Sequence, residues 1–399
     1  MATVNDLLTP TVIAKEALMQ LTNHLAMSRH VYTAYKNEFV KVGNSITIRK
    51  PNKFRATDGA GTRDNTNIEE TSTTISMATQ SHVSWAFSSQ ELTTTIEDYS
   101  KRYISPACNA LANSVDAALC GLYKDVYNYA GTPGTTPNAF SMLGDAQQAL
   151  DDEAAPSDMR IGVMSPAANW SLADALKGTF AMKPANDLYT KGFLGQVANL
   201  NIYSDQNVVR HTNGGFAGGT PLVKTTITAE ASAVVADGCD NADTIEEGDI
   251  FTIAGVYAVN PMSGASTGVL RRFTVTADVD AVASVDRTIP LSPKIIVTGA
   301  YQTVDAYPVD GAAITFIGTA STAYPQNLIF HPNAFALVTV PIEMPANVWG
   351  ARETDKDAGL SIRVVKQYDI DVDEEIIRLD ILYGMKTLYP ELACRLWGK

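Results

Sequence analysis

An acidic stretch near the C-terminus is the most metal-like motif in the chain. Closely spaced carboxylates on a loop are the ligands that calcium takes in proteins. This stretch lacks the central glycine and the flanking helices of an EF-hand, so the pattern favours a solvated turn. The carboxylates concerned are Asp369, Asp371, Asp373, Glu374 and Glu375.

The other residue types that catalyse reactions are scattered. The five histidines lie far apart without metal-ligand partners at helical or turn spacing, so each is predicted to be a surface or capping residue. The glycine-rich segment 214–219 lacks a following Lys-Ser/Thr pair and opens no helix, which excludes a Walker-type phosphate loop. No nucleophile elbow occurs. The sequence therefore predicts no enzyme, no metal and no cofactor. The histidines are His24, His30, His82, His211 and His331, and the cysteines, predicted to be buried free thiols, are Cys108, Cys120, Cys239 and Cys394.

Composition bounds the class of protein. With 399 residues, 45% of them hydrophobic, the chain can bury a large core divided into about two or three units. The net charge of −13 disfavours a protein that grips nucleic acid through phosphates, because such binding needs clustered Lys and Arg. This charge suits either a wall that encloses DNA or plain solubility. No apolar run reaches the ~18–20 residues of a membrane span and no signal peptide is recognisable, so we expect a cytoplasmic chain without membrane contact.

A long helical pattern over residues 88–130 is the strongest structural signal. Apolar residues recur there every three or four positions, the spacing of one helix face. Ser88 and Glu91 match a capping box, and the glycines and proline at 131–134 would stop the helix. Pro106 lies inside the pattern and should kink it, at a cost of about 3 kcal/mol. The pattern is typical of a building block, with a coiled-coil arm or a bundle helix as alternatives.

Two segments before this helix are predicted to form arms. Residues 1–35 contain an apolar helical stripe that needs a partner surface (Val12, Ile13, Leu18, Leu21, Leu25). Residues 45–49 and 71–86 alternate as strands and predict a hairpin with a long polar tip. Mixed charge on the tip suits pairing with a neighbouring subunit, although a solvated loop fits equally well. The tip residues are Lys50, Lys53, Arg55 and Arg63 on the basic side and Asp58, Asp64, Glu69 and Glu70 on the acidic side.

The rest of the chain changes its pattern twice. Helices near 139–151 and 166–177 alternate with strands at 160–164 and 201–203, which indicates layered α/β or α+β structure. Short β-branched runs follow without helices, which predicts a small antiparallel barrel or sandwich inserted into the host domain. Strands then resume, and Trp397 is expected to plug a core. The β runs are 225–228, 249–253, 256–259, 269–276, 295–298 and 313–317, and the final strands are 328–330, 335–340, 361–365 and 376–383.

The order of these elements resembles the Hong Kong 97-type phage capsid fold, an α+β fold with a long spine helix and an extended β-hairpin. The closer resemblance is to the coat protein family of the short-tailed Salmonella phage, whose subunit carries an inserted β-barrel. Segments 99–107, 248–260 and 327–335 carry the likeness, and the chain is shorter than that family implies. The implied divisions are an N-terminal arm (1–41), the hairpin loop (42–87), the spine helix of a peripheral domain (88–135), the first part of an axial domain (136–213), the inserted barrel (214–322) and the axial and peripheral return (323–399).

What the resemblance implies is a major capsid protein without catalytic activity. Such proteins form the pentamers and hexamers of an icosahedral shell in the bacterial host cytoplasm, co-assemble with a scaffolding protein and a portal ring, and enclose double-stranded DNA without sequence-specific contacts. They expand during DNA packaging, and Pro106 is a candidate hinge for that change. The rival hypothesis is a tail, baseplate or surface-layer subunit with a β-sandwich binding module, and a hydrolase is a distant third.

Overall fold

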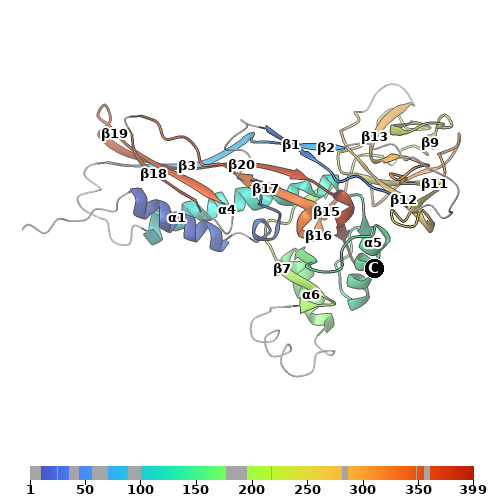
Figure 1. Ribbon diagram of the computed structural model, residues 1–399, viewed down its shortest axis with the longest axis horizontal. Coiled ribbons are helices and arrows are strands. Elements are labelled where there is room, and N and C mark those ends of the chain that lie inside the picture. The colour runs from blue at the N-terminus through green and yellow to red at the C-terminus, as the bar shows by residue number, and fades with distance from the viewer. Residues whose placement is uncertain are drawn as a thin grey trace, which may run out of the picture. The chain divides into compact units, whose positions relative to one another are not determined.

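The computed structural model describes residues 10–24, 26–35, 45–55, 71–88, 100–176, 196–216, 218–280, 286–346, 348–354 and 360–399. Helices and strands mix along the chain, so the protein is α+β as predicted (Figure 1). Its contacts divide it into two compact units. Unit 1 comprises Met1–Ile48, Ser72–Leu119 and Phe335–Lys386, and unit 2 comprises Arg49–Thr71, Cys120–Ala334 and Thr387–Lys399. Among the described residues, no helix is long and apolar enough to cross a membrane.

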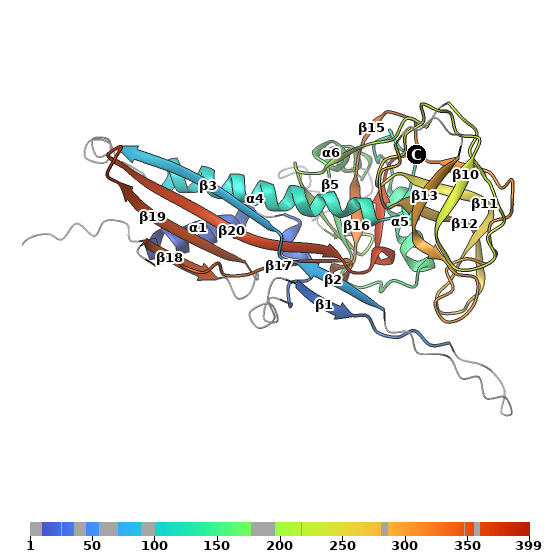
Figure 2. The same cartoon turned by 90° about the horizontal axis from the view of Figure 1, so that it is seen from above.

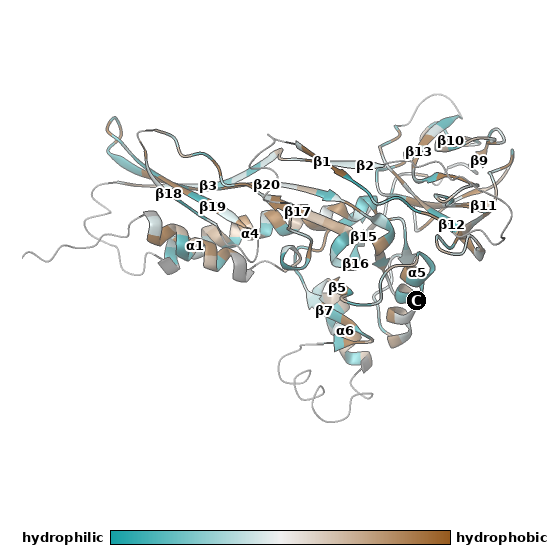
Figure 3. Ribbon diagram, in the orientation of Figure 1, coloured by the Kyte–Doolittle hydropathy of each residue, from teal (hydrophilic) through white to brown (hydrophobic). Residues whose placement is uncertain are grey.

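Unit 1 is built on a long antiparallel sheet. β20 (Glu374–Thr387) lies at its centre, with β19 (Ser361–Asp369) and β3 (Thr79–Ser88) hydrogen-bonded to its two sides. β18 (Trp349–Thr354) pairs with β19, while β17 (Phe335–Thr339) also neighbours β20. Figure 2 shows these strands running side by side. β17 is buried at every position, and Figure 3 shows it towards the hydrophobic end of the scale.

Two α-helices lie in the described part of unit 1. α1 (Pro10–His24) packs against β18 and β19 of the same chain, which supply the partner surface that its apolar stripe requires. Ile13, Leu18 and Leu21 of the predicted stripe are buried, Val12 is exposed, and Leu25 lies outside the described residues. α4 (Ser105–Cys120) buries Leu111 and its neighbours along one face. Buried Asp116 of α4 accepts hydrogen bonds from the Ala26 and Ser28 amides at 2.7 and 3.1 Å, which ties the segment after α1 to α4.

The single helix predicted over residues 88–130 is wrong at its C-terminal end. Ser88, the predicted cap, is the last residue of β3, and residues 89–99, Glu91 among them, lie outside the described residues. The α-helix ends at Cys120, where Gly121 opens the 3-10 helix η3 (Gly121–Asp125), and β4 (Tyr129–Ala130) follows. Gly121 helps to end the α-helix, because glycine destabilises a helix interior by about 1 kcal/mol. Tyr127 and Tyr129 are two residues apart, a spacing that fits a strand as well as a helix.

The predicted hairpin forms with a different pairing. β1 (Ser45–Arg49) begins and ends where expected, but the second strand is split into β2 (Ser72–Ser76) and β3. β1 and β2 form a two-stranded sheet of their own, whereas β3 pairs with β20. We define the hairpin arm as residues 45–55 and 71–76. Its second strand, β2, is followed directly along the chain by β3 of the unit 1 sheet.

In unit 2, a six-stranded mixed sheet carries two helices. Its order is β4, β21 (Ala393–Leu396), β16 (Asn327–Phe330), β5 (Ile161–Met164), β7 (Leu200–Ser204) and β6 (Gln196–Val197). α5 (Phe140–Asp152) and α6 (Pro166–Leu176) bury their apolar faces in a core shared with these strands. The helices and strands predicted at 139–151, 160–164, 166–177, 201–203 and 328–330 are confirmed within one or two residues. Trp397 is buried, and its indole donates to the Pro325 carbonyl at 3.0 Å.

A second six-stranded sheet occupies the β-rich part of unit 2. Its order is β14 (Ile314–Phe316), β11 (Ile250–Val259), β12 (Ser266–Val275), β13 (Arg287–Ile295), β10 (Ala231–Asp237) and β9 (Leu222–Val223). The outermost strands of this sheet, β14 and β9, are also joined to each other. The Val223 amide donates to the Ala312 carbonyl at 2.8 Å, and the Ile314 amide donates to the Pro221 carbonyl at 2.9 Å. A separate hydrophobic core fills it, including Phe251, Phe273 and Ile289.

The strand predictions here are partly wrong. Residues 225–228 form no strand, 249–253 and 256–259 merge into β11, and 295–298 lie at and beyond the end of β13. β10 and most of β13 were missed, as was β18 of unit 1. The chain enters and leaves this part through β8 (Arg210–Thr212) and β15 (Ala323–Pro325), which pair antiparallel. Their pairing continues through the Asn213 amide to Thr322 and the Ser321 amide to Gly214, at 3.1 and 3.0 Å.

Candidate functional site

Three of the predicted arm-tip residues, Lys50, Lys53 and Arg55, lie within the described part of the chain. The Lys53 amide donates to the Tyr301 hydroxyl at 3.3 Å, and its ammonium lies 3.9 Å from the Glu391 carboxylate. Arg55 donates through Nη1 to Gln302 at 2.8 Å. Both residues therefore contact the β-rich part of their own chain, beside the loops that follow β11 and β13. The remaining tip residues, Asp58, Arg63, Asp64, Glu69 and Glu70, lie outside the described residues.

A pocket of about 220 Å³ opens where the arm meets this part of unit 2. Lys53, Lys294 and Tyr301 line it, and so do Glu391 and the end of α5 at Glu153. We call it the arm pocket. Its wall also includes Arg271, whose guanidinium is buried.

An aromatic and an acidic partner hold Arg271 in the pocket wall. Its Nη1 donates to the Glu153 carboxylate at 2.5 Å, and its guanidinium carbon lies 4.7 Å from the centre of the Tyr127 ring. Burial by itself would lower the pKa of Arg271, but the Glu153 carboxylate and the Tyr127 hydroxyl together outweigh burial and raise it. Burial raises the pKa of Tyr127 well above its usual range. The pair is therefore a charged Arg271 and Glu153 beside a neutral phenol.

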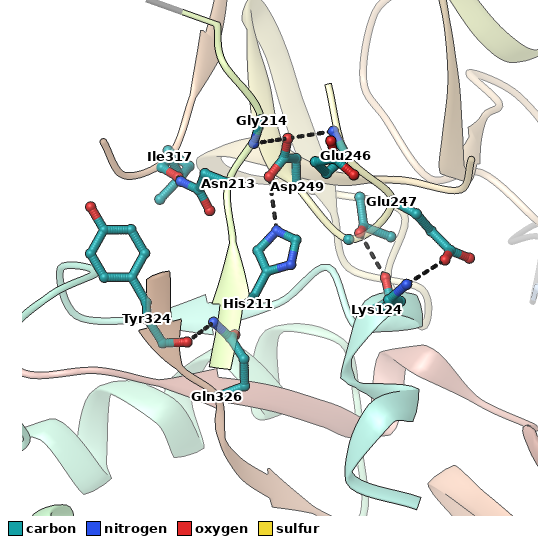
Figure 4. A network of polar contacts seen from close by, with 12 residues as sticks. Lys124, His211, Asn213, Gly214, Glu246, Glu247, Asp249, Ile317, Tyr324 and Gln326 are labelled. Atoms are coloured by element: carbon teal, nitrogen blue, oxygen red, sulfur yellow. Dashed lines mark hydrogen bonds and ion pairs between the residues drawn. The ribbon is translucent and has the colours of Figure 1, made fainter. Parts of the chain in front are cut away.

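A second buried network surrounds Asp249 at the start of β11 (Figure 4). His211 of β8 shares a 2.8 Å hydrogen bond between its Nε2 and Oδ1 of Asp249. Oδ2 of Asp249 accepts the backbone amides of Gly214 at 3.1 Å and Glu246 at 2.9 Å. One carboxylate thereby binds strand β8 through His211, the segment that follows β8 through Gly214, and the turn that precedes β11 through Glu246. We call Asp249 with these three partners the Asp249 clamp.

The hydrogen-bond donors of the clamp can be assigned from its chemistry. A carboxylate only accepts, so His211 donates through Nε2. The hydroxyl of Tyr123 in η3 lies 3.0 Å from Nδ1 of the same ring. Burial raises the pKa of Tyr123, so the phenol keeps its proton and donates it to Nδ1. Gly248 has a φ of +99°, and an added Cβ there would meet the Lys124 side chain at 3.2 Å and His211 at 3.4 Å, so glycine is needed for this approach.

Arg395 of β21 connects the clamp to the host sheet. It donates through Nη1 to the Gly248 carbonyl at 2.8 Å, and its guanidinium lies over the Tyr123 ring at 5.1 Å. Burial lowers its pKa to about 10, so it stays charged at neutral pH. Lys124 and Glu247 add a half-exposed ion pair at 2.7 Å on the outside. The clamp therefore orients the β-rich part through groups that are largely inaccessible to water.

The predicted hinge residue lies at a helix junction. Pro106 is the second residue of α4, directly after the π-helical segment Ser100–Ile104. Because the π-helical segment runs into α4 without a gap, Pro106 lies inside a continuous helical stretch, where it lacks the backbone donor that another residue would supply. Prolines and π-turns are both recognised causes of helix bending.

Groups that could support catalysis are not brought together in the described part of the chain. No cluster of three or more metal-ligating residues occurs among the described residues. The four cysteines are free and buried as predicted, and burial raises the pKa of Cys108 and Cys394 to about 12. His211 is buried in β8, so its prediction as a surface or capping residue was wrong, whereas His331, also buried, precedes η4 (Pro332–Ala334) and caps it by accepting the Asn333 amide at 3.3 Å. The acidic stretch lies at the turn between β19 and β20, where the Asp371 amide donates a hydrogen bond to the Asp369 carboxylate.

The comparison with known families covers nearly the entire chain. Residues 1–398 match the family described as P22 coat protein, gene protein 5. The chain belongs to this coat protein family. A curated relative, the major capsid protein of Acyrthosiphon pisum secondary endosymbiont phage 1, is 24% identical over 291 residues and covers 67% of each chain. This P22 coat protein family member is a major capsid protein, a virion component that associates with itself to form a shell. The rival tail, baseplate or surface-layer hypothesis is not favoured.

Solved phage structures resemble the coat protein at low sequence identity. A structure described as Mycobacterium phage Che8 is 13% identical, covers 93% of this chain and 90% of its own, and has a TM-score of 0.49. The capsid structure of Cyanophage P-SCSP1u is 12% identical, covers 90% and 84%, and has a TM-score of 0.43.

Sequence reasoning missed both buried networks of the coat protein. His211 and Asp249 are 38 residues apart, and Glu153 and Arg271 are 118 apart, so no local spacing reveals them. A weak signal existed at Gly248-Asp249, where a glycine and an acid precede a long β run. The Gly-rich segment likewise reflects close packing, since a Cβ on Gly214 would clash with the Thr244 carbonyl.

Proposed function

We propose that this major capsid protein forms pentamers and hexamers of an icosahedral shell, with a Hong Kong 97-type fold. The observation that carries the proposal is the β1–β2 arm, a two-stranded sheet with no further strand partner among the described residues. An isolated two-stranded hairpin is marginally stable in water, and its outer edges offer unpaired backbone groups. Contacts with a second copy would stabilise such an arm.

Within this proposal, residues 214–322 are an inserted β-barrel domain, and the other divisions are those given above (1–41, 42–87, 88–135, 136–213 and 323–399). The joined ends of the six-stranded sheet, its separate core and the paired strands β8 and β15 support the insertion. Expressed alone, residues 214–322 should unfold cooperatively. A fragment without dispersed amide signals would remove the inserted domain from the proposal.

The proposed partners follow from the shell. We infer a scaffolding protein and a portal ring during assembly in the host cytoplasm, and packaged double-stranded DNA without sequence-specific contacts. The net charge of −13 supports the last point, because a wall that repels the polyanion does not bind it. The proposed role is structural, without catalysis.

Two residue sets have proposed roles in assembly. Lys53, Arg55 and Arg63 with Asp58, Asp64, Glu69 and Glu70 would pair with neighbouring subunits, and Pro106 would be the hinge at which the helix bends during expansion. The π-turn before Pro106 supports the second role. Pro106→Ala should then assemble but shift the temperature at which precursor shells expand. An unchanged expansion temperature would leave Pro106 as a static bend.

The assembly proposal is tested by purifying the chain alone and with scaffolding protein and examining the products by sedimentation and electron microscopy. We expect capsomer rings or closed shells. Reversing charge at Arg55 together with Arg63 should reduce shell yield, and the melting temperature of the monomer measures how much of that loss comes from breaking the Arg55–Gln302 hydrogen bond within the chain. Lys386→Glu, a single charge reversal at an exposed lysine of β20 that is not one of the arm-tip residues, is the control. Dispersed monomers or filaments under all conditions would contradict the proposal.

A further inference from the structure

The arm pocket concentrates positive charge in a strongly acidic protein. Lys53, Arg271 and Lys294 line it, against the two carboxylates of Glu153 and Glu391. Arg55, two residues beyond Lys53, binds Gln302 in the same wall and adds a fourth cation. The chain as a whole carries 43 acidic and 30 basic residues. Lys53 and Arg271 are paired with Glu391 and Glu153, so the unbalanced positive charge comes from Lys294 and Arg55 and would attract an acidic group.

Hydrogen-bond donors of Arg271 in the pocket wall, and of Arg55 behind the lining residue Gln302, lack acceptors. Nε of Arg271 is buried without a hydrogen-bond partner, and the Arg271 residue is only 3% exposed. Nε and Nη2 of Arg55 are likewise buried without partners. These two nitrogens form one edge of the guanidinium, the edge that binds both oxygens of a carboxylate. Buried donors without acceptors destabilise a protein, so an incoming acceptor would be favoured.

Lys294 provides an accessible charge at the pocket mouth. It lies in β13, its side chain is exposed, and it has no ion-pair partner among the described residues. By contrast, Lys53 already faces Glu391 at 3.9 Å. Lys294 is therefore the cation through which an outside group can be detected without disturbing the fold.

The size of the pocket restricts what it can hold. Its volume of about 220 Å³ is below the roughly 300–1,000 Å³ of typical small-molecule sites. A single side chain of a partner protein fits such a volume, and anchors of this kind fill pockets at the centres of interfaces. In a shell, the protein most often in contact with a subunit is another copy of itself, and this chain has an excess of carboxylates to offer.

We propose that the arm pocket is an acceptor site for a carboxylate side chain of a second copy of this chain, held by Lys294 at the mouth and by the guanidinium groups of Arg271 and Arg55. This inference rests on the proposed shell and names a contact within it.

Zero-length carbodiimide coupling tests the contact directly, because it joins an amine only to a carboxylate that touches it. Shells are assembled from equal amounts of ¹⁵N-labelled and unlabelled chain, coupled, digested and analysed by mass spectrometry. We expect Lys294 joined to an Asp or Glu in mixed-isotope pairs, in shells but not in monomers. Coupling of Lys53 to Glu391 within one copy is the internal control.

Charge variants provide the second arm of the test. Lys294→Glu should raise the protein concentration needed for assembly several-fold, Lys294→Gln should raise it less, and the matched reversal Lys386→Glu should leave it near the parent value. If parent shells form but Lys294 couples only within its own copy, or if Lys294→Glu assembles like Lys386→Glu, the pocket contact is wrong and the shell stands. If the parent chain forms no shells or capsomers, the proposed function itself fails.

Discussion

Asp249 in unit 2 and Asp380 in unit 1 are both buried aspartates, yet they are satisfied in different ways. Asp249 accepts two backbone amides and a histidine. Asp380, in the middle of β20, accepts Nη2 of Arg363 at 2.6 Å and Nε of Arg378 at 2.6 Å. The first carboxylate therefore binds turns and chain segments to one another, while the second neutralises side chains on the sheet.

The difference reflects what each region must specify. In unit 1, the antiparallel register already aligns Arg363 opposite Asp380 on neighbouring strands, so charge only reinforces an existing geometry. In unit 2, no ladder aligns β8, the Glu246 turn and η3, so the Asp249 clamp supplies the alignment. Removing the clamp should therefore have the larger structural consequence.

The largest effect is expected from Asp249→Ala. The substitution leaves His211 Nε2 and two amides buried without an acceptor, so we expect a loss of about 3–5 kcal/mol in the free energy of unfolding. Hydrogen exchange followed by mass spectrometry should show lost protection in segments 210–215 and 244–250. Asp249→Asn, which keeps one acceptor oxygen, should lie between this variant and the parent. Uniform loss of protection over both units would contradict a local clamp.

Asp380→Asn should cost less, about 1.5–3 kcal/mol, because Arg378 is 40% exposed and water can replace its partner. The loss of protection should be confined to β19, β20 and β3. A double-mutant cycle with Arg363→Met measures how much of the cost belongs to the Arg363 pair. A cost equal to that of Asp249→Ala would remove the distinction between the two aspartates.

The pH dependence of stability separates the two regions next. Burial opposes the ionisation of Asp380, but hydrogen bonds from Arg363 and Arg378 outweigh it and lower its pKa. Because the folded pKa lies below the unfolded value of about 3.9, the stability from ionised Asp380 is complete above that pH and is lost as pH falls through the folded pKa. Acid titration of unit 1 by hydrogen exchange should therefore be flatter in Asp380→Asn than in the parent. Superimposable acid limbs would show that Asp380 contributes no such dependence.

The smallest effect is expected at the outside of the clamp. Lys124 and Glu247 are about 40% exposed, and ion pairs of this kind contribute ~0–1 kcal/mol. Glu247→Gln should change stability within that range, and the remaining difference should vanish in high salt. A cost near that of Asp249→Ala would mean that alignment comes from the surface pair rather than from the buried carboxylate.

The sequence predicted the elements whose patterns are local. α5, β5 and β16 carry continuous or periodic apolar residues and were found, as was the buried face of α1. β13 was missed because it contains Pro290 and Pro293, which normally argue against a strand. β10 was missed because it is rich in small alanines. The buried networks escaped because their members meet only through tertiary packing.

The joined ends of the β9–β14 sheet have a consequence for the behaviour of the unassembled chain. A sheet without free edges offers no template for strand addition, the step by which crowded chains form fibrils. Among the described residues, open backbone edges remain at the outer strands of the other sheets, such as β18 and β6, and in the β1–β2 arm, where contact with a second chain is part of the proposed role. Joining the ends of the β9–β14 sheet thereby removes one route to aggregation without closing the edges of the arm.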